Sequence, residues 1–144
     1  MSRTPRLVAS ISIVVGALAI IAGITVYLLV YRTLSAQHIT VSSDAPFLAG
    51  DEVDGPFSAY AEAMAINEHA LDAGKGKTYA EIPKDDPARE TVMDAAFLQT
   101  SLFTSVVAFG VAALVVALGA MFVLLGLAGR ELDRRTAGGV PPPT

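Results

Sequence analysis

Two long apolar segments without acidic or basic side chains, residues 7–31 and 95–129, dominate the hydropathy pattern of the chain. Within the second, residues 106–127 are almost wholly apolar and as a helix would extend about 33 Å, which is enough to cross the hydrocarbon core of a bilayer. In lipid only a helix or a closed barrel satisfies the backbone, and neither segment alternates as a barrel strand does. The pattern therefore predicts two transmembrane helices.

The first segment could also be a cleaved signal peptide. Its 25 residues exceed the apolar region of a signal peptide, which is about 7–15 residues long. The one plausible cleavage site, after Ala36, would place Leu34 where a small residue is needed. Tyr27 and Tyr31 suit the membrane interface at its end. We therefore expect residues 7–31 to remain as a membrane anchor.

Charge predicts the orientation of the two helices. Residues 32–94 hold twelve acidic and five basic side chains, a net charge of −7, whereas residues 1–6 form a basic leader. The arginines of the two flanks are Arg3, Arg6, Arg130, Arg134 and Arg135. Because positive flanks stay in the cytoplasm, we expect both termini inside the cell membrane and residues 32–94 outside. Residues 130–144 have few apolar side chains and are expected to be a disordered cytoplasmic tail.

The outer segment is predicted to be mainly helical. An alanine-rich helix is expected over about 56–73, with Gly74 ending it, and a second from about 87, after an Asp86 cap, continuing into the membrane. One apolar stripe of the first helix is predicted at Phe57, Tyr60, Ala61 and Met64. Alternating Ile39 and Val41 suggest a short extended piece before it. The predicted fold is an all-α membrane protein: an antiparallel hairpin of two transmembrane helices with a small acidic extracytoplasmic cap.

Small residues recur every seven positions in both apolar segments. Lipid offers no hydrophobic drive between helices, so such residues mark where backbones approach closely. We expect these residues to form a packing seam, either within the hairpin or between copies of the chain. They are Ala9, Gly16 and Gly23 in the first segment and Ala112, Gly119 and Gly126 in the second.

Few residues suggest chemistry. Glu62, His69 and Asp72 fall roughly on one helical face and are weak candidates for a divalent metal site. The sequence Gly76-Lys77-Thr78 lacks the glycine that a phosphate loop needs five positions earlier, so no nucleotide is expected. The chain has no cysteine, and its two histidines form no legible catalytic arrangement. We therefore expect no catalytic residue and no cofactor. Without a basic face, nucleic acid is not an expected partner either.

Three stretches carry a resemblance to a known family: ITVSSDAPFLAGDEVDGPFSAYAEAMAINEHALD, KTYAEIPKDDPARETVM and SLFTSVVAFGVAALV. Over roughly residues 6–130 the chain resembles a family of small actinobacterial two-span membrane proteins, often named aromatic ring-opening dioxygenase, LigA type. The resemblance supports the two-span topology. The family name implies non-haem iron, held by histidine and carboxylate ligands, and cleavage of a catechol ring.

Three functions follow as hypotheses. The first is a non-catalytic accessory or scaffold subunit that packs in the bilayer with other membrane proteins or with its own copies. The second is the catechol dioxygenase that the resemblance implies. The third is an oligomeric pore, although neither apolar segment contains an ionisable residue to line one.

Overall fold

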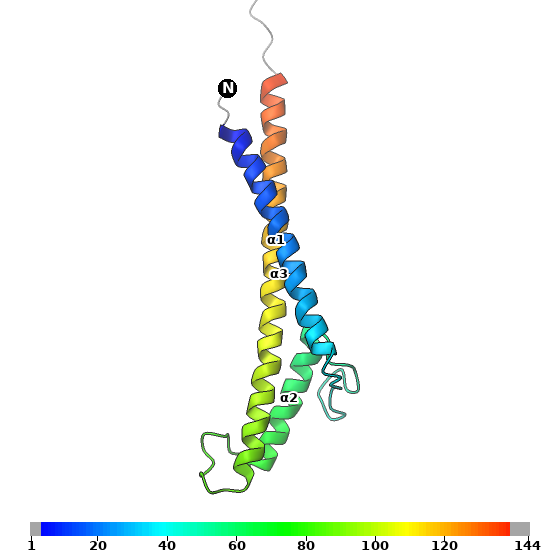
Figure 1. The fold of residues 1–144 in the computed structure, drawn as a ribbon, viewed down its shortest axis with the longest axis vertical. Helices are drawn as coiled ribbons and strands as arrows, with labels where there is room; N and C mark the ends of the chain where they lie inside the picture. Colours follow the sequence, from blue (N-terminus) through cyan, green and yellow to red (C-terminus); the bar gives the residue numbers. More distant parts are fainter. Residues whose placement is uncertain (1–3, 139–144) are drawn as a thin grey trace, which may run out of the picture. The chain divides into compact units, whose positions relative to one another are not determined.

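The structure is a computed structural model that describes residues 4–138, with side-chain surroundings for residues 6–135. Over that part of the chain it is all-helical, with α1 (Thr4–Ser35), α2 (Pro56–Ala73) and α3 (Ala88–Gly138) in order (Figure 1). No strand forms there, and the predicted extended piece contributes one isolated antiparallel bridge, between Thr40 and Glu52. The all-helical class is the predicted one.

The ends of α2 and the start of α3 follow the predicted signals. Pro56 opens α2, and the Ser58 hydroxyl accepts a hydrogen bond of 3.1 Å from the N–H of Gly55. The helix ends at Ala73, and the N–H of Gly74 donates to the carbonyl of Ala70 at 2.9 Å. At α3, Asp86 Oδ1 accepts the N–H of Ala88 at 2.9 Å, as an N-cap does.

The C-terminal end of α3 corrects a prediction. Residues 131–138 were expected to be disordered, but they continue the helix. Glu131 explains part of this, because it accepts a hydrogen bond of 3.0 Å from Arg135 one turn later and lies 3.9 Å from Arg134. Pairs at this spacing, with the acid first, support a helix without apolar burial. The rest of the predicted tail, residues 139–144, lies outside the described residues.

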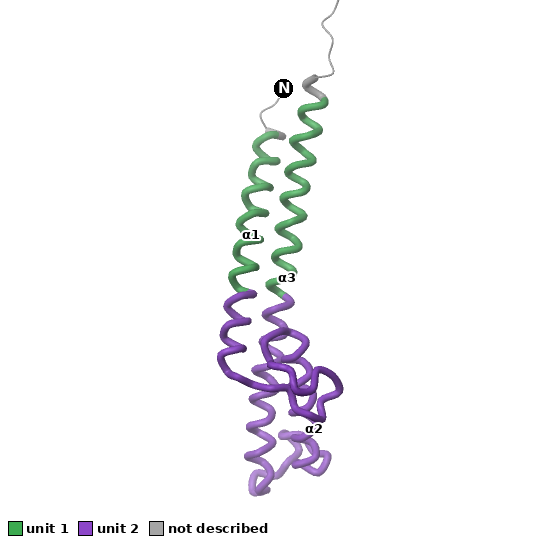
Figure 2. The backbone as a smooth tube through the Cα atoms, turned by 90° about the vertical axis from the view of Figure 1, so that its right-hand side faces the viewer, with its two compact units in different colours: residues 1–26, 111–144 green, residues 27–110 purple. Residues whose placement is uncertain are grey.

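The chain divides into two compact units, drawn in different colours in Figure 2. In the first, residues 4–26 of α1 and 111–138 of α3 lie side by side. The contacts between them pair low numbers on α1 with high numbers on α3, so the two helices run antiparallel. Among the described residues of this unit, no other element is present.

The second unit, residues 27–110, has its own apolar core. The loop residues Val41 and Val53 are buried beside the alanine face of α2. Leu34 from the end of α1 and Leu102 from α3 complete this cluster. The segment between the long helices is thus not a free-standing domain, since its core borrows side chains from α1 and α3.

The buried face of α2 differs from the predicted stripe. Ala61 is fully buried, but Phe57 is 74% exposed and Tyr60 is 42% exposed. The helix instead buries Ser58, Ala59, Ala61, Glu62, Ala63 and Ala65. Small side chains let α2 pack closely, and Tyr60 stacks on Phe47 and lies edge-on to Phe103 outside that contact.

Two helical stretches, Arg6–Ser35 and Ala88–Arg135, are long and apolar enough to cross a membrane. In their most apolar windows only 11% and 17% of the residues are buried. A core helix of a water-soluble protein passes the same test of length and composition but is mostly buried. The low burial is the feature that distinguishes these two helices from core helices.

Candidate functional site

The six small residues singled out in the sequence lie along the contact between α1 and α3 in the first unit. Gly16 faces Gly119, Gly23 faces Ala112, and Gly126 faces Ala9. Each step of seven residues forward on α1 is matched by seven residues back on α3, so the two repeats meet in antiparallel register. We call this row of six residues the seam: Ala9, Gly16, Gly23, Ala112, Gly119 and Gly126.

At the four glycines of the seam the backbones approach so closely that a methyl group would not fit. A Cβ atom on Gly16 would lie 2.5 Å from the carbonyl oxygen of Gly119, and one on Gly119 would lie 2.7 Å from the carbonyl oxygen of Gly16. Branched side chains of the opposite helix occupy the space that each glycine leaves, Val123 over Gly16 and Ile20 over Gly119. Gly110 of α3 is different, because nothing lies within 4 Å of its Cβ position.

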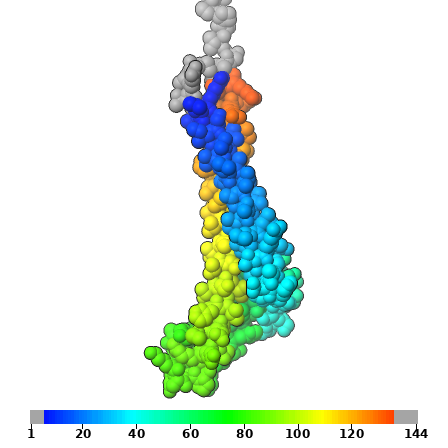
Figure 3. Space-filling model, viewed as in Figure 1, coloured from blue at the N-terminus to red at the C-terminus, as the bar shows by residue number. Residues whose placement is uncertain are grey.

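Burial in this unit is inverted relative to a water-soluble helix pair. Among residues 6–26 and 111–135, the six seam residues are the only ones that are buried. Apart from the branched side chains that lie over the seam glycines, most large apolar side chains point outward. Many expose more than half of their surface, among them Leu7, Ile11, Leu18, Ile21, Leu114, Leu124 and Leu125. On the face shown in Figure 3, the atoms of α1 (blue) lie directly against those of α3 (yellow to orange). Small residues inside and large apolar residues outside are typical of helices that associate in lipid.

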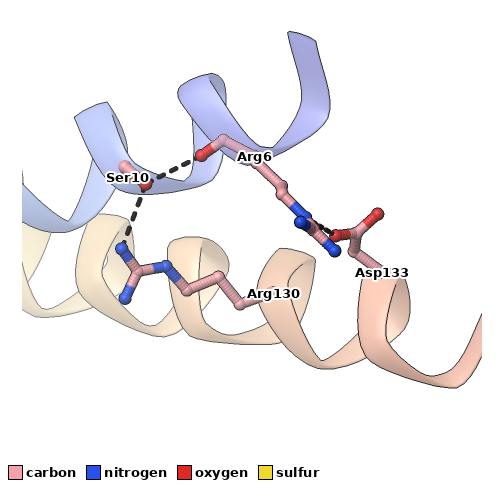
Figure 4. Close-up of polar contacts among 4 residues, drawn as sticks. All are labelled: Arg6, Ser10, Arg130 and Asp133. Atoms are coloured by element: carbon pink, nitrogen blue, oxygen red, sulfur yellow. Dashed lines mark hydrogen bonds and ion pairs between the residues drawn. The ribbon is translucent and has the colours of Figure 1, made fainter. Parts of the chain in front are cut away.

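Polar contacts join the N-terminal end of α1 to the C-terminal part of α3 (Figure 4). Arg6 of α1 forms an ion pair with Asp133 of α3. Arg130 donates a hydrogen bond of 3.0 Å to the hydroxyl of Ser10, which itself donates to the carbonyl oxygen of Arg6 at 2.8 Å. Arg6 and Arg130, which predict the orientation by their charge, therefore also link α1 to α3 in the structure.

The three weak metal candidates are engaged separately in the second unit. Glu62 is 7% exposed, and its carboxylate accepts two hydrogen bonds from Ser42: one from the N–H at 2.6 Å and one from the hydroxyl at 3.1 Å. His69 Nε2 lies 2.6 Å from Asp44 Oδ2. Asp72 is exposed near the end of α2.

The contact between His69 and Asp44 shifts the pKa values of both residues. The hydrogen bond to Asp44 raises the pKa of His69, and the same bond lowers the pKa of Asp44. The nearby carboxylates Glu62 and Asp72 add a smaller upward effect on the pKa of His69. The pair therefore anchors the loop before α2 to the helix most strongly when His69 is protonated.

Within the part of the chain that the structure describes, no group of three or more histidine, cysteine, aspartate or glutamate residues could hold a metal ion. Glu62 and His69 each bind a residue of the loop over 36–55 instead of converging with Asp72. Nothing in the sequence pattern around Ser42 and Asp44 indicates which residue of α2 each of them contacts. These two loop partners could therefore not be predicted from the sequence.

Comparisons with known proteins add no assignment. No protein-family model, no curated protein and no solved structure matches the chain.

Proposed function

We propose that the chain is a two-span integral protein of the plasma membrane that serves as a non-catalytic accessory or scaffold subunit. Both termini would lie in the cytoplasm and residues 32–94 outside. The single observation that carries the membrane assignment is the inverted burial of the first unit, where only the seam is buried. In water the exposed leucines, isoleucines and valines of α1 and α3 would have to be hidden, whereas lipid solvates them.

The partner surface in this proposal is the outward apolar face of the helix pair. Each glycine of the seam is covered by the other long helix of the same chain, α3 over the glycines of α1 and α1 over those of α3, so these glycines are not free for another protein. Partner helices, or copies of this chain, would therefore contact large side chains such as Leu18 and Leu125. The seam acts indirectly, because it holds α1 and α3 at the separation that presents this face.

The acidic segment supports the extracytoplasmic assignment and the scaffold role. Residues 32–94 carry a net charge of −7 from twelve acidic and five basic side chains, and most of these acids are exposed. Leu34, Leu102 and Phe109 of the long helices contribute to the core of this unit, so the acidic surface is held on a packed base. Such a surface is suited to contact a basic partner by charge complementarity.

Chemical crosslinking in native membranes tests the scaffold role. Leucine at Gly16 or at Gly119 should force α1 and α3 apart and remove or weaken the crosslinked partner bands. Leucine at Gly110 is the matched control, because its Cβ position is open and the same residue change is made in α3, the helix that holds Gly119. Partner bands that are the same in all three variants and in the unmodified chain would contradict the scaffold role.

A further inference from the structure

The second unit contains a groove whose lining suits an amphiphile. Its volume is about 660 Å³, within the range of small-molecule sites. The end of α1, the middle of α2 and residues 98–108 of α3 form its walls. The apolar part of the lining consists of Leu29, Val30, Leu34, Ile39, Ile66, Leu98, Leu102 and Ala108.

The hydroxyl groups in the groove do not make it a generally polar site. Thr33 donates to the carbonyl of Leu29, and Thr104 and Ser105 likewise donate to carbonyls one turn earlier in α3. The protons of these three hydroxyl groups are therefore already used within their own helices, and Ser101 carries the fourth hydroxyl group of the lining. Among the lining residues, Glu62 carries the only formal charge, and Gln37 adds an amide.

Glu62 makes the groove selective for charge. Its carboxylate is 7% exposed, and Ser42 fixes both of its oxygens in place. No lysine, arginine or histidine lines the groove, and none of the ion pairs found among the described residues includes Glu62. His69 lies near enough for Glu62 to raise its pKa, but the hydrogen-bond partner of His69 is Asp44. A carboxylate in apolar surroundings with no cation in hydrogen-bond contact attracts a cation and repels an anion.

We propose that this groove binds a single-chain amphiphile with a primary ammonium head group, the ammonium at Glu62 and the alkyl chain along α3. The stretch of α3 that lines the groove, residues 98–108, is about 15 Å long, which matches an extended dodecyl chain. An ammonium group donates up to three hydrogen bonds, and the oxygens of Glu62 and Gln37 can accept them. The volume of about 660 Å³ suits one alkyl chain better than the two chains of a bilayer phospholipid, so we assign the groove to a free single-chain amine.

Equilibrium binding of radiolabelled dodecylamine to the full chain in phosphatidylcholine nanodiscs tests this assignment, with protein-free nanodiscs as the correction for partitioning. We expect saturable binding of one molecule per chain, at least about tenfold tighter than binding of dodecanol or dodecyl sulfate, which share the chain but not the charge. Equal affinity for the three probes would overturn the proposal. Phosphatidylethanolamine added to the nanodisc should leave dodecylamine binding unchanged, and displacement would overturn the assignment to a single-chain ligand.

Single substitutions test whether Glu62 supplies the negative charge that binds the ammonium group. Glu62→Gln keeps an acceptor for Ser42 and should weaken dodecylamine binding about tenfold while leaving dodecanol binding unchanged. Glu68→Gln, which removes an exposed acid from the same helix, is the matched control and should change neither. Ser105→Trp fills the groove without touching Glu62 and should abolish binding of both probes. Unchanged amine binding in Glu62→Gln or in Ser105→Trp, or an equal loss in Glu68→Gln, would contradict the proposal.

Discussion

Gly16 and Gly119 face each other across α1 and α3 so closely that a Cβ atom on either residue would overlap the other's carbonyl oxygen, at 2.5 and 2.7 Å. The helix pair is therefore held at a separation that only glycine permits at this point. The contact is made of backbone and of the branched side chains Val123 and Ile20, which fill the space above the two glycines. This separation is the basis of the first prediction.

Alanine at Gly16 or Gly119 should destabilise the helix pair by about 1–3 kcal/mol, the usual cost of overpacking a well-filled contact. Alanine at Gly110 should instead be neutral or stabilise the chain by up to about 1 kcal/mol, because the site is open and alanine favours a helix. Reversible denaturation in mixed micelles measures all three variants. If alanine at Gly110 lowers the stability as much as alanine at Gly16, the close packing at the seam is not what stabilises the helix pair.

The buried carboxylate of Glu62 supports the second unit through Ser42. Alanine at Glu62 leaves the N–H of Ser42 without its 2.6 Å acceptor, so we expect a loss of about 1–3 kcal/mol, with glutamine milder. Alanine at Glu68, an exposed acid of the same helix, should stay within about 0.5 kcal/mol of the unmodified chain. Thermal unfolding followed by circular dichroism gives the comparison, and equal effects at the two sites would contradict the anchoring role of Glu62.

The His69–Asp44 pair should make the loop before α2 sensitive to pH. The pKa of His69 is raised, so its contribution is complete below the ordinary imidazole value of about 6.5 and is lost as the pH rises through the folded value above it. The pKa of Asp44 is lowered, so its contribution is present above about 3.9 and is lost as the pH falls through the folded value below it. The pair therefore holds the loop best at pH values between the lowered pKa of Asp44 and the raised pKa of His69.

An NMR titration of His69 in micelles checks this directly. Asparagine at Asp44 should return the pKa of His69 towards its ordinary value, because the hydrogen bond that His69 makes to the carboxylate of Asp44 is the main cause of the shift. Asparagine at Asp72, which contributes only a smaller charge effect, is the control. If the pKa of His69 is the same in the Asp44 variant as in the unmodified chain, the hydrogen bond to Asp44 does not cause the shift.

The composition of the seam could be predicted from the sequence, whereas its pairing could not. A seven-residue repeat of glycine and alanine in an apolar helix indicates a close-packed face. The period keeps the small residues on one side of the helix, and small residues let the backbones of two helices approach each other in lipid. Which glycine meets which depends on the relative register of two helices that are far apart in sequence. The repeat is also compatible with contacts between copies, so only the coordinates show that Gly23 faces Ala112 within one chain.

Other parts of the fold had no local signal. The hydrogen bonds from Ser42 to Glu62 join residues twenty positions apart, and neither residue type favours burial in isolation. The helical spacing of Phe57 placed it on the predicted apolar stripe of α2, yet the close approach of α2 selects alanines and leaves Phe57 outside. The helix beyond Arg130 was missed because Glu131 and Arg135 stabilise it through charge without apolar periodicity.

Thiol labelling in intact cells tests the central claim, that α1 and α3 cross a membrane with residues 32–94 outside and both ends inside. The chain has no cysteine, so one introduced at Glu68 or at Thr136 is the only reactive thiol. A membrane-impermeant maleimide should label the Glu68 variant in intact cells and the Thr136 variant only after the cells are permeabilised. Labelling of Thr136 in intact cells, protection of Glu68, or recovery of the protein in the soluble fraction without detergent would contradict the two-span membrane arrangement.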